Sequence, residues 1–345
     1  MIKESVDKLL MGDDLCDSEF KELIVSKGDG AEYLRCCAAQ VREKYYSDKV
    51  YVRGLIEVTN YCKNDCLYCG IRRSNKCAER YRLSKEDILS CCKEGYELGF
   101  KTFVLQGGED PYFTCERVCD IVSSIKSLYP ECAVTLSLGE KTREEYEEYY
   151  KAGADRYLLR HETADSIHYS KLHPKELTLE NRIECLNNLK DIGFQTGCGF
   201  MIGSPYQTLD NIVNDLRFIK AFEPHMVGIG PFVPHDKTPF ANEKQGDFDM
   251  TVNLLAIVRL LLPKVLLPAT TALGTIHPKG REIGIMAGAN VVMPNLSPVD
   301  VRKKYMLYNN KLSSGGESAQ HIKELADRME AIGYQIAMTR GDIKL

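Results

Sequence analysis

The sequence predicts an α/β fold: a closed (β/α)8 barrel of the TIM type with an N-terminal helical extension and a short C-terminal extension. Three observations lead to this prediction. β-Rich runs alternate with amphipathic helical patterns from Val52 to Met293, which favours a parallel sheet. The runs number eight and fill roughly 250 residues, the usual size of such a barrel. Polar and glycine-containing segments follow the predicted strands, where barrels of this type carry their chemistry.

The predicted elements follow one another in a regular order. Residues 1–48 carry apolar positions at helical spacing and predict a helical extension. The predicted strands are Val52–Thr59, Thr102–Gln106, Ala133–Leu138, Arg156–Leu159, Gln195–Met201, Met226–Ile229, Leu266–Ala269 and Asn290–Met293. The clearest helical patterns are Lys85–Leu98, Thr142–Ala152, Asn211–Phe222 and Thr251–Leu262. We expect the barrel to occupy residues 49–312.

Residues 313–345 predict a C-terminal helix and tail packed on the barrel. Within them Ala319–Ile332 has a helical pattern, and Tyr334–Met338 predicts a late strand outside the barrel. No clear linker separates these parts, so the sequence favours a single domain with helical additions at its two ends.

The composition indicates a cytoplasmic protein with a large core. The 345 residues are 44% hydrophobic, the formal net charge is −4, and the absence of a long basic run argues against a nucleic-acid partner. The charged start at Met1–Asp14 does not resemble a signal peptide. The most apolar run, Leu254–Leu262, contains Arg259 and is too short to span a membrane. Fourteen cysteines in such a chain indicate metal binding and ordinary buried thiols rather than disulfides.

A group of three cysteines follows the first predicted strand. Cys62, Cys66 and Cys69 form the pattern C-x₃-C-x₂-C. Three thiolates are one short of the four that close a zinc site or an iron–sulfur cluster. A [4Fe–4S] cluster held by these three would leave one iron open to a small chelating ligand, and we favour this interpretation. The alternatives are a zinc site with a remote fourth ligand and buried inert thiols.

Two further strand ends carry polar side chains that share a face. Alternation along the strand places Thr135 and Ser137 on one side, and hydroxyls bonded only to the backbone are the alternative. Arg160 and Glu162 share a face at the next strand end, together with Arg156 if that strand is regular. Arg160 suits a carboxylate and Glu162 a ribose or ammonium group, while an internal ion pair is the alternative.

Glycine, hydroxyl and arginine residues supply the remaining candidates. Gln106-Gly107-Gly108-Glu109 follows the second strand, and its glycines permit close approach of a ligand, although such glycines often form only a turn. Thr270 and Thr271 place two adjacent hydroxyls after the seventh strand, which suits an anion or a carboxylate. Arg182 is a further carboxylate-binding candidate, although most arginines on helices are solvated.

The cysteine pattern, with the aromatic Tyr68 before its last cysteine, resembles the signature of the radical S-adenosylmethionine (SAM) superfamily. In that superfamily the open iron chelates the amino and carboxylate groups of SAM. Electron transfer into the sulfonium then cleaves a C–S bond and gives a 5′-deoxyadenosyl radical. From about residue 50 to 310 the chain also resembles the maturases of the [FeFe]-hydrogenase active site. The matching segments are Arg72-Arg73-Ser74-Asn75, Arg80-Tyr81-Arg82, Gly108–Tyr112, Val134–Glu140, Arg156–Ala164, Met226–His235, Ala241-Asn242-Glu243 and Pro268–Ile276.

This resemblance implies a role for individual residues. Cys62, Cys66 and Cys69 are implied to hold the [4Fe–4S] cluster. Contacts to SAM are implied at Tyr68, Gln106, Gly107, Gly108, Glu109, Thr135, Ser137, Glu162, Arg182 and Met226. A carboxylate-binding floor of the barrel is implied at Arg160, Thr270 and Thr271. The implied substrate is an iron–cysteine carbonyl/cyanide precursor, and the implied partners are a reduced electron donor protein and other hydrogenase maturases.

Three alternative functions stay open. Methylornithine synthase shares Arg80-Tyr81-Arg82 but should lack the pair Thr270-Thr271, and biotin synthase would carry an Asn-His-Asn run at Leu159–Glu162. A non-catalytic cluster carrier would not need the polar strand ends. Some members of the maturase family have a second cysteine motif near the C-terminus, whereas the last cysteine here is Cys198. We therefore expect no second cluster of that kind.

Overall fold

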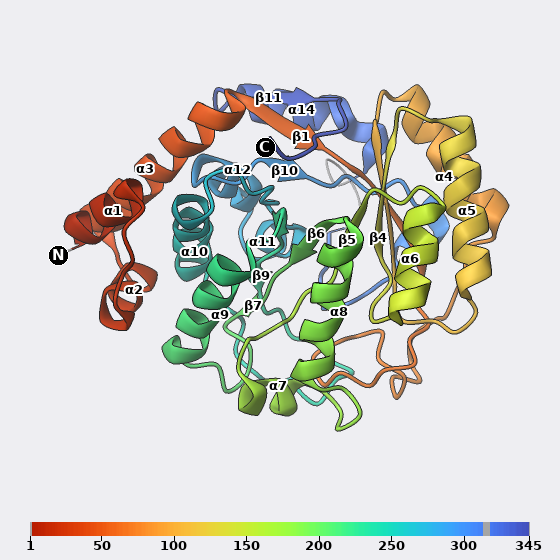
Figure 1. Ribbon diagram of the computed structural model, residues 1–345, viewed down its shortest axis with the longest axis horizontal. Coiled ribbons are helices and arrows are strands. Elements are labelled where there is room, and N and C mark those ends of the chain that lie inside the picture. The colour runs from red at the N-terminus through yellow and green to blue at the C-terminus, as the bar shows by residue number, and fades with distance from the viewer. Residues whose placement is uncertain (1, 313–317, 345) are drawn as a thin grey trace.

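The computed structural model describes residues 2–312 and 318–344, and its centre is a parallel barrel (Figure 1). Six strands are hydrogen-bonded in the order β2-β3-β4-β5-β6-β8. Their bounds are β2 Gly54–Thr59, β3 Thr102–Gly107, β4 Ala133–Ser137, β5 Arg156–Leu158, β6 Gln195–Cys198 and β8 Met226–Val227. Bridges from Met226 to Leu266 and from Pro268 to Val291 continue the ring to β10 (Val291–Val292), which pairs with β1 (Lys49–Val52). Because β1 leads directly into β2, the two form one strand position of the barrel. The ring is thus closed, and it has eight parallel strand positions within residues 49–295.

Helices wrap the outer face of this barrel (Figure 1). Those between the staves are α4 Lys85–Glu97, α5 Cys115–Leu128, α6 Arg143–Lys151, α7 Ser166–Leu172, α8 Leu179–Ile192, α9 Leu209–Phe222, α10 Phe248–Leu261, α11 Thr271–Ile276 and α12 Gly280–Met286. A short helix, α13 (Val299–Arg302), follows β10. The predicted helices are confirmed to within a few residues, and no helix among residues 2–312 and 318–344 combines the length and apolar character that crossing a bilayer requires.

Local sequence signals explain where these helices begin and which side they bury. Ser84 and Thr142 each accept a hydrogen bond from the third residue of the following helix, and an acidic residue there completes a capping box. On α9 the fully or almost fully buried residues Ile212, Leu216 and Ile219 recur at helical spacing. Burial of each such side chain contributes about 1.5–3 kcal/mol, which fixes the helix against the sheet.

Three predicted strands differ from those observed. Leu266–Ala269 makes only two single-residue bridges, and Pro268 has no N–H with which to extend a ladder. Gln195–Met201 is divided into β6 and β7 (Met201–Ile202), and Met226–Ile229 into β8 and β9 (Gly230–Pro231). The division occurs at Gly199, whose φ is +153° and whose missing Cβ would lie 2.0 Å from the oxygen of Gly228. The segments around Gly199 and Gly228 approach each other too closely there to form regular strands.

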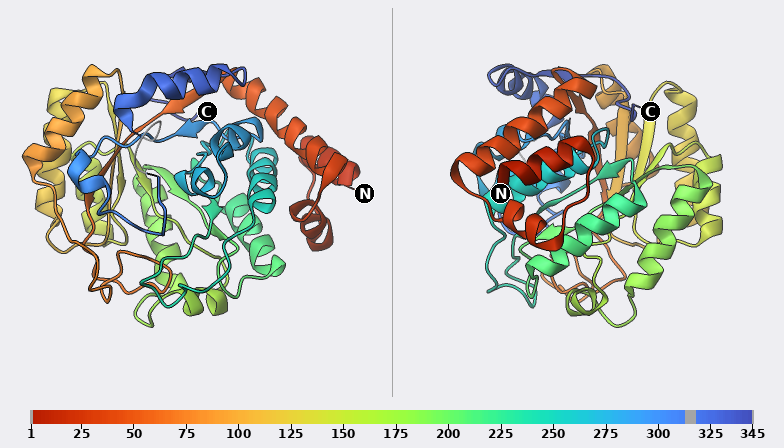
Figure 2. Two further views of the ribbon diagram at one scale, coloured as in Figure 1. Left: turned by 180° about the vertical axis from the view of Figure 1, so that it is seen from behind. Right: turned by 60° about the vertical axis from the view of Figure 1, so that its left-hand side comes forward.

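The chain ends pack on the barrel. Helices α1 (Ile2–Met11), α2 (Asp17–Ile24) and α3 (Gly28–Tyr46) form an arm along one side and contact α9, α10 and α12 (Figure 2). After a 3₁₀ turn at Ala319–His321, α14 (Ile322–Glu330) leads to β11 (Gln335–Ala337), which pairs in parallel with β1. The late strand is thus confirmed. The expected boundary between the barrel and the C-terminal extension, at residue 313, is within residues 313–317, which lie outside the described residues.

Candidate active site

The loop after β2 carries the three cysteines, and its own polar side chains hold it in shape. Asn60 Nδ2 donates to the main-chain oxygens of Glu79 at 2.8 Å and Lys304 at 2.7 Å, and its Oδ1 accepts from Tyr81 N–H at 2.8 Å. The Arg80 guanidinium donates to four main-chain oxygens of the loop. These belong to Asn60, Ile71, Arg72 and Asn75. Neither Asn60 nor Arg80 was predicted to support the site, although both flank the cysteine motif.

The three motif cysteines lie close together as partly buried free thiols. Burial raises the pKa of Cys62, Cys66 and Cys69, the last to about 12. The thiols of Cys69 and Cys62 raise the pKa of Cys66 further. In the described part of the chain, no three His, Cys, Asp or Glu side chains are arranged to hold a single metal ion. The ligands of a [4Fe–4S] cluster bind separate irons, so thiols around a cluster need not converge on one point.

The loop after β3 packs directly against the cysteine loop. A Cβ on Gly108 would lie 2.8 Å from Cys62 Cβ, so only glycine fits this approach. The main-chain oxygen of Glu109 accepts from Lys63 N–H at 2.8 Å, and the side-chain Oε1 of Glu109 accepts from Glu140 N–H at 3.0 Å. The loops after β2, β3 and β4 therefore meet, as the predicted order of motifs requires.

Polar side chains also lie within β4 and just after β5. Val134 and Leu136 pack in the hydrophobic core, so alternation turns Thr135 to the barrel interior, where its hydroxyl is buried without a hydrogen-bond partner among the described residues. Arg160 Nη2 lies 3.0 Å from Glu162 Oε2, while Arg160 Nε is buried without a partner. Such atoms are costly unless a ligand satisfies them. The hydroxyl and guanidinium fit a small molecule with amino and carboxylate groups, as SAM has.

Other predicted cofactor residues make contacts within the protein. Gln106 Nε2 donates to the hydroxyl of Tyr305 at 3.4 Å, and Gly107 pairs in register with Thr59. Tyr68 Oη lies 3.2 Å from His173 Nε2. The side chain of Ser137 is half-buried at the end of β4. Their proposed contacts to SAM stay predictions.

Arg182 is held by contacts within the protein. Its Nε donates to Glu140 Oε1 and its Nη1 to the main-chain oxygen of Arg160, both at 2.5 Å. Arg182 therefore orients the β4 and β5 strand ends in the structure, and its contact to SAM stays a prediction. Sequence alone gave no indication of Glu140 as its partner, since the two lie 42 positions apart.

The predicted substrate-binding threonines lie at the start of α11. Thr270 caps this helix, with its hydroxyl accepting from Leu273 N–H at 3.4 Å. Thr271 Oγ1 accepts from Arg281 Nη2 at 3.4 Å. A Cβ on Gly230 would lie 2.7 Å from Thr270 Oγ1, which shows how closely β9 approaches this helix.

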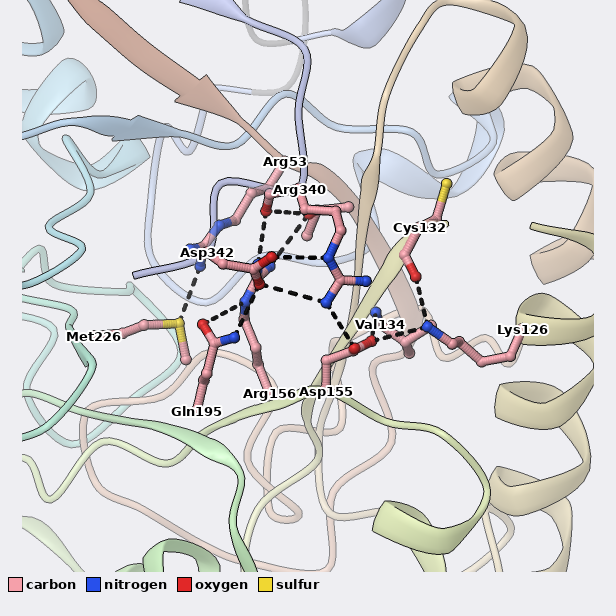
Figure 3. A network of polar contacts seen from close by, with 11 residues as sticks. Arg53, Lys126, Cys132, Val134, Asp155, Arg156, Gln195, Met226, Arg340 and Asp342 are labelled. Carbon is pink, nitrogen blue, oxygen red and sulfur yellow. Dashed lines mark hydrogen bonds and ion pairs between the residues drawn. The ribbon is translucent and has the colours of Figure 1, made fainter. Parts of the chain in front are cut away.

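Arg156 does not join Arg160 and Glu162, because the regular strand on which their predicted shared face depended ends at Leu158. The wholly buried Arg156 lies at the amino-terminal end of the barrel, where it donates to Asp342 Oδ1 at 2.5 Å (Figure 3). Alternation holds only for β5, which ends at Leu158.

Met226 also points into the network of Figure 3. Arg53 Nη1 lies 3.1 Å from its sulfur, and burial, followed by the charge of Arg156, holds the pKa of Arg53 well below its usual range. The role of Met226 in cofactor binding stays a prediction. Of the charged residues in this network only Arg156 was a sequence candidate; Arg53, Lys126, Asp155, Arg340 and Asp342 were missed.

Comparison with known proteins agrees with this geometry. Residues 56–219 match the family described as the radical SAM superfamily. The [FeFe] hydrogenase maturase subunit HydE of Thermotoga maritima is 51% identical over 275 residues, which are 80% of this chain and 78% of that protein. The 3-methylornithine synthase of Methanosarcina acetivorans is 28% identical over 334 residues, 96% of this chain and 93% of the relative. A crystal structure of methylornithine synthase (PylB) superposes with a TM-score of 0.85 at 26% identity, covering 96% of this chain and 97% of that one.

The predicted fold is confirmed by the closed parallel barrel and by this structural likeness. Residues 56–219 span the staves from β2 to β6 together with the cysteine loop. The identity to HydE extends over most of both chains and so is not confined to the cysteine motif. The chain therefore belongs to the radical SAM superfamily and, within it, to the family of the [FeFe]-hydrogenase maturase HydE.

Proposed function

We propose that this protein is a radical SAM enzyme that acts in assembly of the di-iron subcluster of [FeFe] hydrogenase, on an iron–cysteine carbonyl/cyanide precursor. One observation carries the proposal: three neighbouring thiols follow β2, and unsatisfied polar atoms of Thr135 and Arg160 lie within β4 and just after β5. The identity to HydE supports the choice of reaction within the superfamily.

Some residues of the site bind the cluster and SAM, and others bind the substrate. Cys62, Cys66 and Cys69 hold the [4Fe–4S] cluster, and the lack of a side chain at Gly108 lets the loop after β3 pack against Cys62. When bound, the cluster delivers an electron to the sulfonium of SAM, which cleaves a C–S bond and gives the 5′-deoxyadenosyl radical. Thr135 completes its missing hydrogen bond with a polar group of SAM.

The charged pair deeper in the barrel positions both ligands. Glu162 accepts a hydrogen bond from the ribose or the ammonium group of SAM, and Arg160 donates to a carboxylate of the substrate. Thr270 and Thr271 supply hydroxyls to the same carboxylate from the start of α11. Nε and Nη2 of Arg160 are buried, and together with the two hydroxyls they fix the orientation of a small anionic substrate.

The reaction requires partners that the chain does not contain. A reduced protein donates one electron for each SAM cleaved, and the other hydrogenase maturases provide the precursor or receive the product. We place the protein in the cytoplasm, where reduced thiols persist, since all fourteen of its cysteines are free in the described structure.

The test is anaerobic maturation of purified apo-[FeFe] hydrogenase with the other maturation factors, with this protein added or omitted. We expect hydrogen evolution to depend on this protein and on SAM. Cys66→Ser should abolish both SAM cleavage and maturation, whereas Cys77→Ser, at an exposed cysteine of the same loop, should abolish neither. Wild-type-like cleavage by Cys66→Ser would overturn the cluster assignment. If omission changes nothing while 5′-deoxyadenosine still forms, the substrate is wrong and methylornithine chemistry is tested next.

A further inference from the structure

We propose that an exposed basic and aromatic surface beside Cys62 is the docking site for the electron donor, an acidic one-electron carrier protein. The inference rests on the proposed function, because only an enzyme that reduces SAM needs this electron. The surface, called here the donor surface, consists of Tyr61, Lys63, Arg73, Lys76, Arg82, Tyr112 and Arg117. In the transfer the carrier loses one electron and the cluster gains it.

The charge of the cysteine loop is opposite to that of the chain as a whole. Residues 60–82 contain six lysines and arginines and two acidic residues, which gives +6 − 2 = +4, whereas the whole chain carries −4. The two acidic residues, Asp65 and Glu79, are paired with Arg72 and Lys304. A local positive field on an acidic protein steers an acidic partner to that place.

Two cations of the donor surface are free to meet such a partner. Arg73 and Lys76 are exposed, and neither forms an ion pair with any described residue. Arg73 is nevertheless held near the cluster, because its N–H donates to the main-chain oxygen of Asn64 at 2.9 Å. Unpaired cations on an ordered loop strengthen association without first breaking an internal pair.

The aromatic part of the donor surface is already ordered. The Arg82 guanidinium lies 4.0 Å from the ring centre of Tyr61 and 4.9 Å from that of Tyr112, and the Arg117 guanidinium lies 4.0 Å from the ring centre of Tyr112. Arg82 is fixed by two hydrogen bonds to Asp110, of 2.7 and 2.9 Å. Tyr61 and Tyr112 are 37% and 39% exposed. Ordered tyrosine and arginine side chains are the residues that dominate protein–protein interfaces.

The donor surface begins one residue from a cluster ligand. Tyr61 and Lys63 flank Cys62 in the chain, and both are exposed while Cys62 is partly buried. Electron transfer slows steeply with distance, so a carrier must dock where a ligand comes nearest to the surface. Charge, ordered aromatic rings and proximity to the cluster therefore coincide on one surface.

The test compares a protein donor with a small chemical reductant. The variant Arg73→Glu/Lys76→Glu/Arg117→Glu reverses three exposed charges that neither bind the cluster nor face the cavity. A matched control, Lys3→Glu/Lys27→Glu/Lys323→Glu, changes the net charge equally at exposed sites on or next to α1, α3 and α14. Formation of 5′-deoxyadenosine is measured with dithionite, with reduced flavodoxin and with reduced ferredoxin at several salt concentrations.

We expect both variants to form 5′-deoxyadenosine at the wild-type rate with dithionite. For the donor-surface variant alone, we expect the KM for flavodoxin or ferredoxin to rise by about tenfold at low salt. The difference should shrink as salt is added. An unchanged KM for both carriers would overturn the proposal. It would also be overturned if the triple variant and the single variant Arg117→Glu, at a residue outside the cysteine loop, each lost as much activity with dithionite as with the carriers. Failure of wild-type protein to cleave SAM with dithionite would instead refute the proposed function.

Discussion

His161 Nε2 lies 3.2 Å from Asp215 Oδ1, and both side chains are wholly buried behind the strand end that carries Glu162. The N–H of Gly199 donates to His161 Nδ1 at 3.2 Å, so the neutral ring carries its proton on Nε2. Asp215 Oδ1 also accepts from Ala164 N–H at 2.5 Å. The pair thus holds the chain on both sides of Glu162, whose φ of +65° is a strained conformation for a residue other than glycine.

This pair predicts an unusual pH dependence of stability. Burial raises the pKa of Asp215 well above its usual range, and the nearby Glu162 adds to the effect. A carboxyl with a raised folded-state pKa stabilises the fold below its unfolded pKa of about 4, and this contribution is lost as the pH rises through the folded pKa. Asp215→Asn should therefore gain stability relative to the wild type as the pH rises from about 5 through the raised folded-state pKa of Asp215, by up to about 1.4 kcal/mol per pH unit.

Urea unfolding of both proteins across that pH range checks the prediction. Burial, followed by the charges of Arg160 and Arg182, lowers the pKa of His161 to about 3. His161 therefore stays neutral in both folded proteins, and its titration in the unfolded chains cancels. A difference in unfolding free energy that does not change with pH would show that Asp215 is ionised in the folded protein.

Thr135→Val separates a ligand contact from a structural one. The buried hydroxyl of Thr135 has no protein partner, so its removal should leave the unfolding free energy within about 1 kcal/mol of wild type or raise it. Loss of its bond to SAM should raise the dissociation constant by about tenfold. Thr102→Val is the matched control, because Thr102 Oγ1 bonds to Arg156 and Arg340 and should affect stability alone. Equal SAM affinity of Thr135→Val and wild type would refute the contact.

The parts of the site that are local in sequence could be predicted, because a strand and the loop after it occupy consecutive residues. The cysteine loop and the glycines after β3 are of this kind. Alternation, however, predicts which face of the sheet a side chain occupies and not how far along the strand it lies. Arg156 and Arg160 are four residues apart, which is about 13 Å along an extended strand, and so belong to opposite ends of the barrel. Two partners of Arg156, Arg340 and Asp342, come from the C-terminal tail, which no local pattern connects to β5.

Gly108→Ala should disrupt the cluster without unfolding the barrel. The added Cβ would lie 2.2 Å from the main-chain oxygen of Tyr61 and 2.8 Å from Cys62 Cβ, so the cysteine loop must move. We expect iron content and SAM cleavage to fall at least about tenfold, while the apo-protein keeps its fold, since the displaced loop is at the surface. Gly228→Ala, at another strand end, meets nothing closer than 3.9 Å and should retain its iron. Wild-type iron content in Gly108→Ala would contradict the proposed packing.

Asp342→Ala should destabilise the barrel from its amino-terminal end. The Asp342 carboxylate accepts from the wholly buried Arg156 and from Arg340 (Figure 3), and its loss leaves Arg156 and Arg53 as neighbouring buried cations. Removal of one partner of a buried pair costs about 3–5 kcal/mol, and we expect about 2–3 kcal/mol here because Asp342 itself is 38% exposed and partly screened by solvent.

Urea unfolding at neutral pH measures this loss, with Asp300→Ala at an exposed acidic residue as the control. A second substitution, Arg156→Met, removes the buried charge that Asp342 neutralises. In the Asp342→Ala background it should therefore restore part of the lost stability, whereas alone it should destabilise the protein, since it leaves Asp342 with only Arg340 and Gln195 as partners. If the two substitutions were additive, the coupling between the C-terminal tail and β5 would not come from this ion pair.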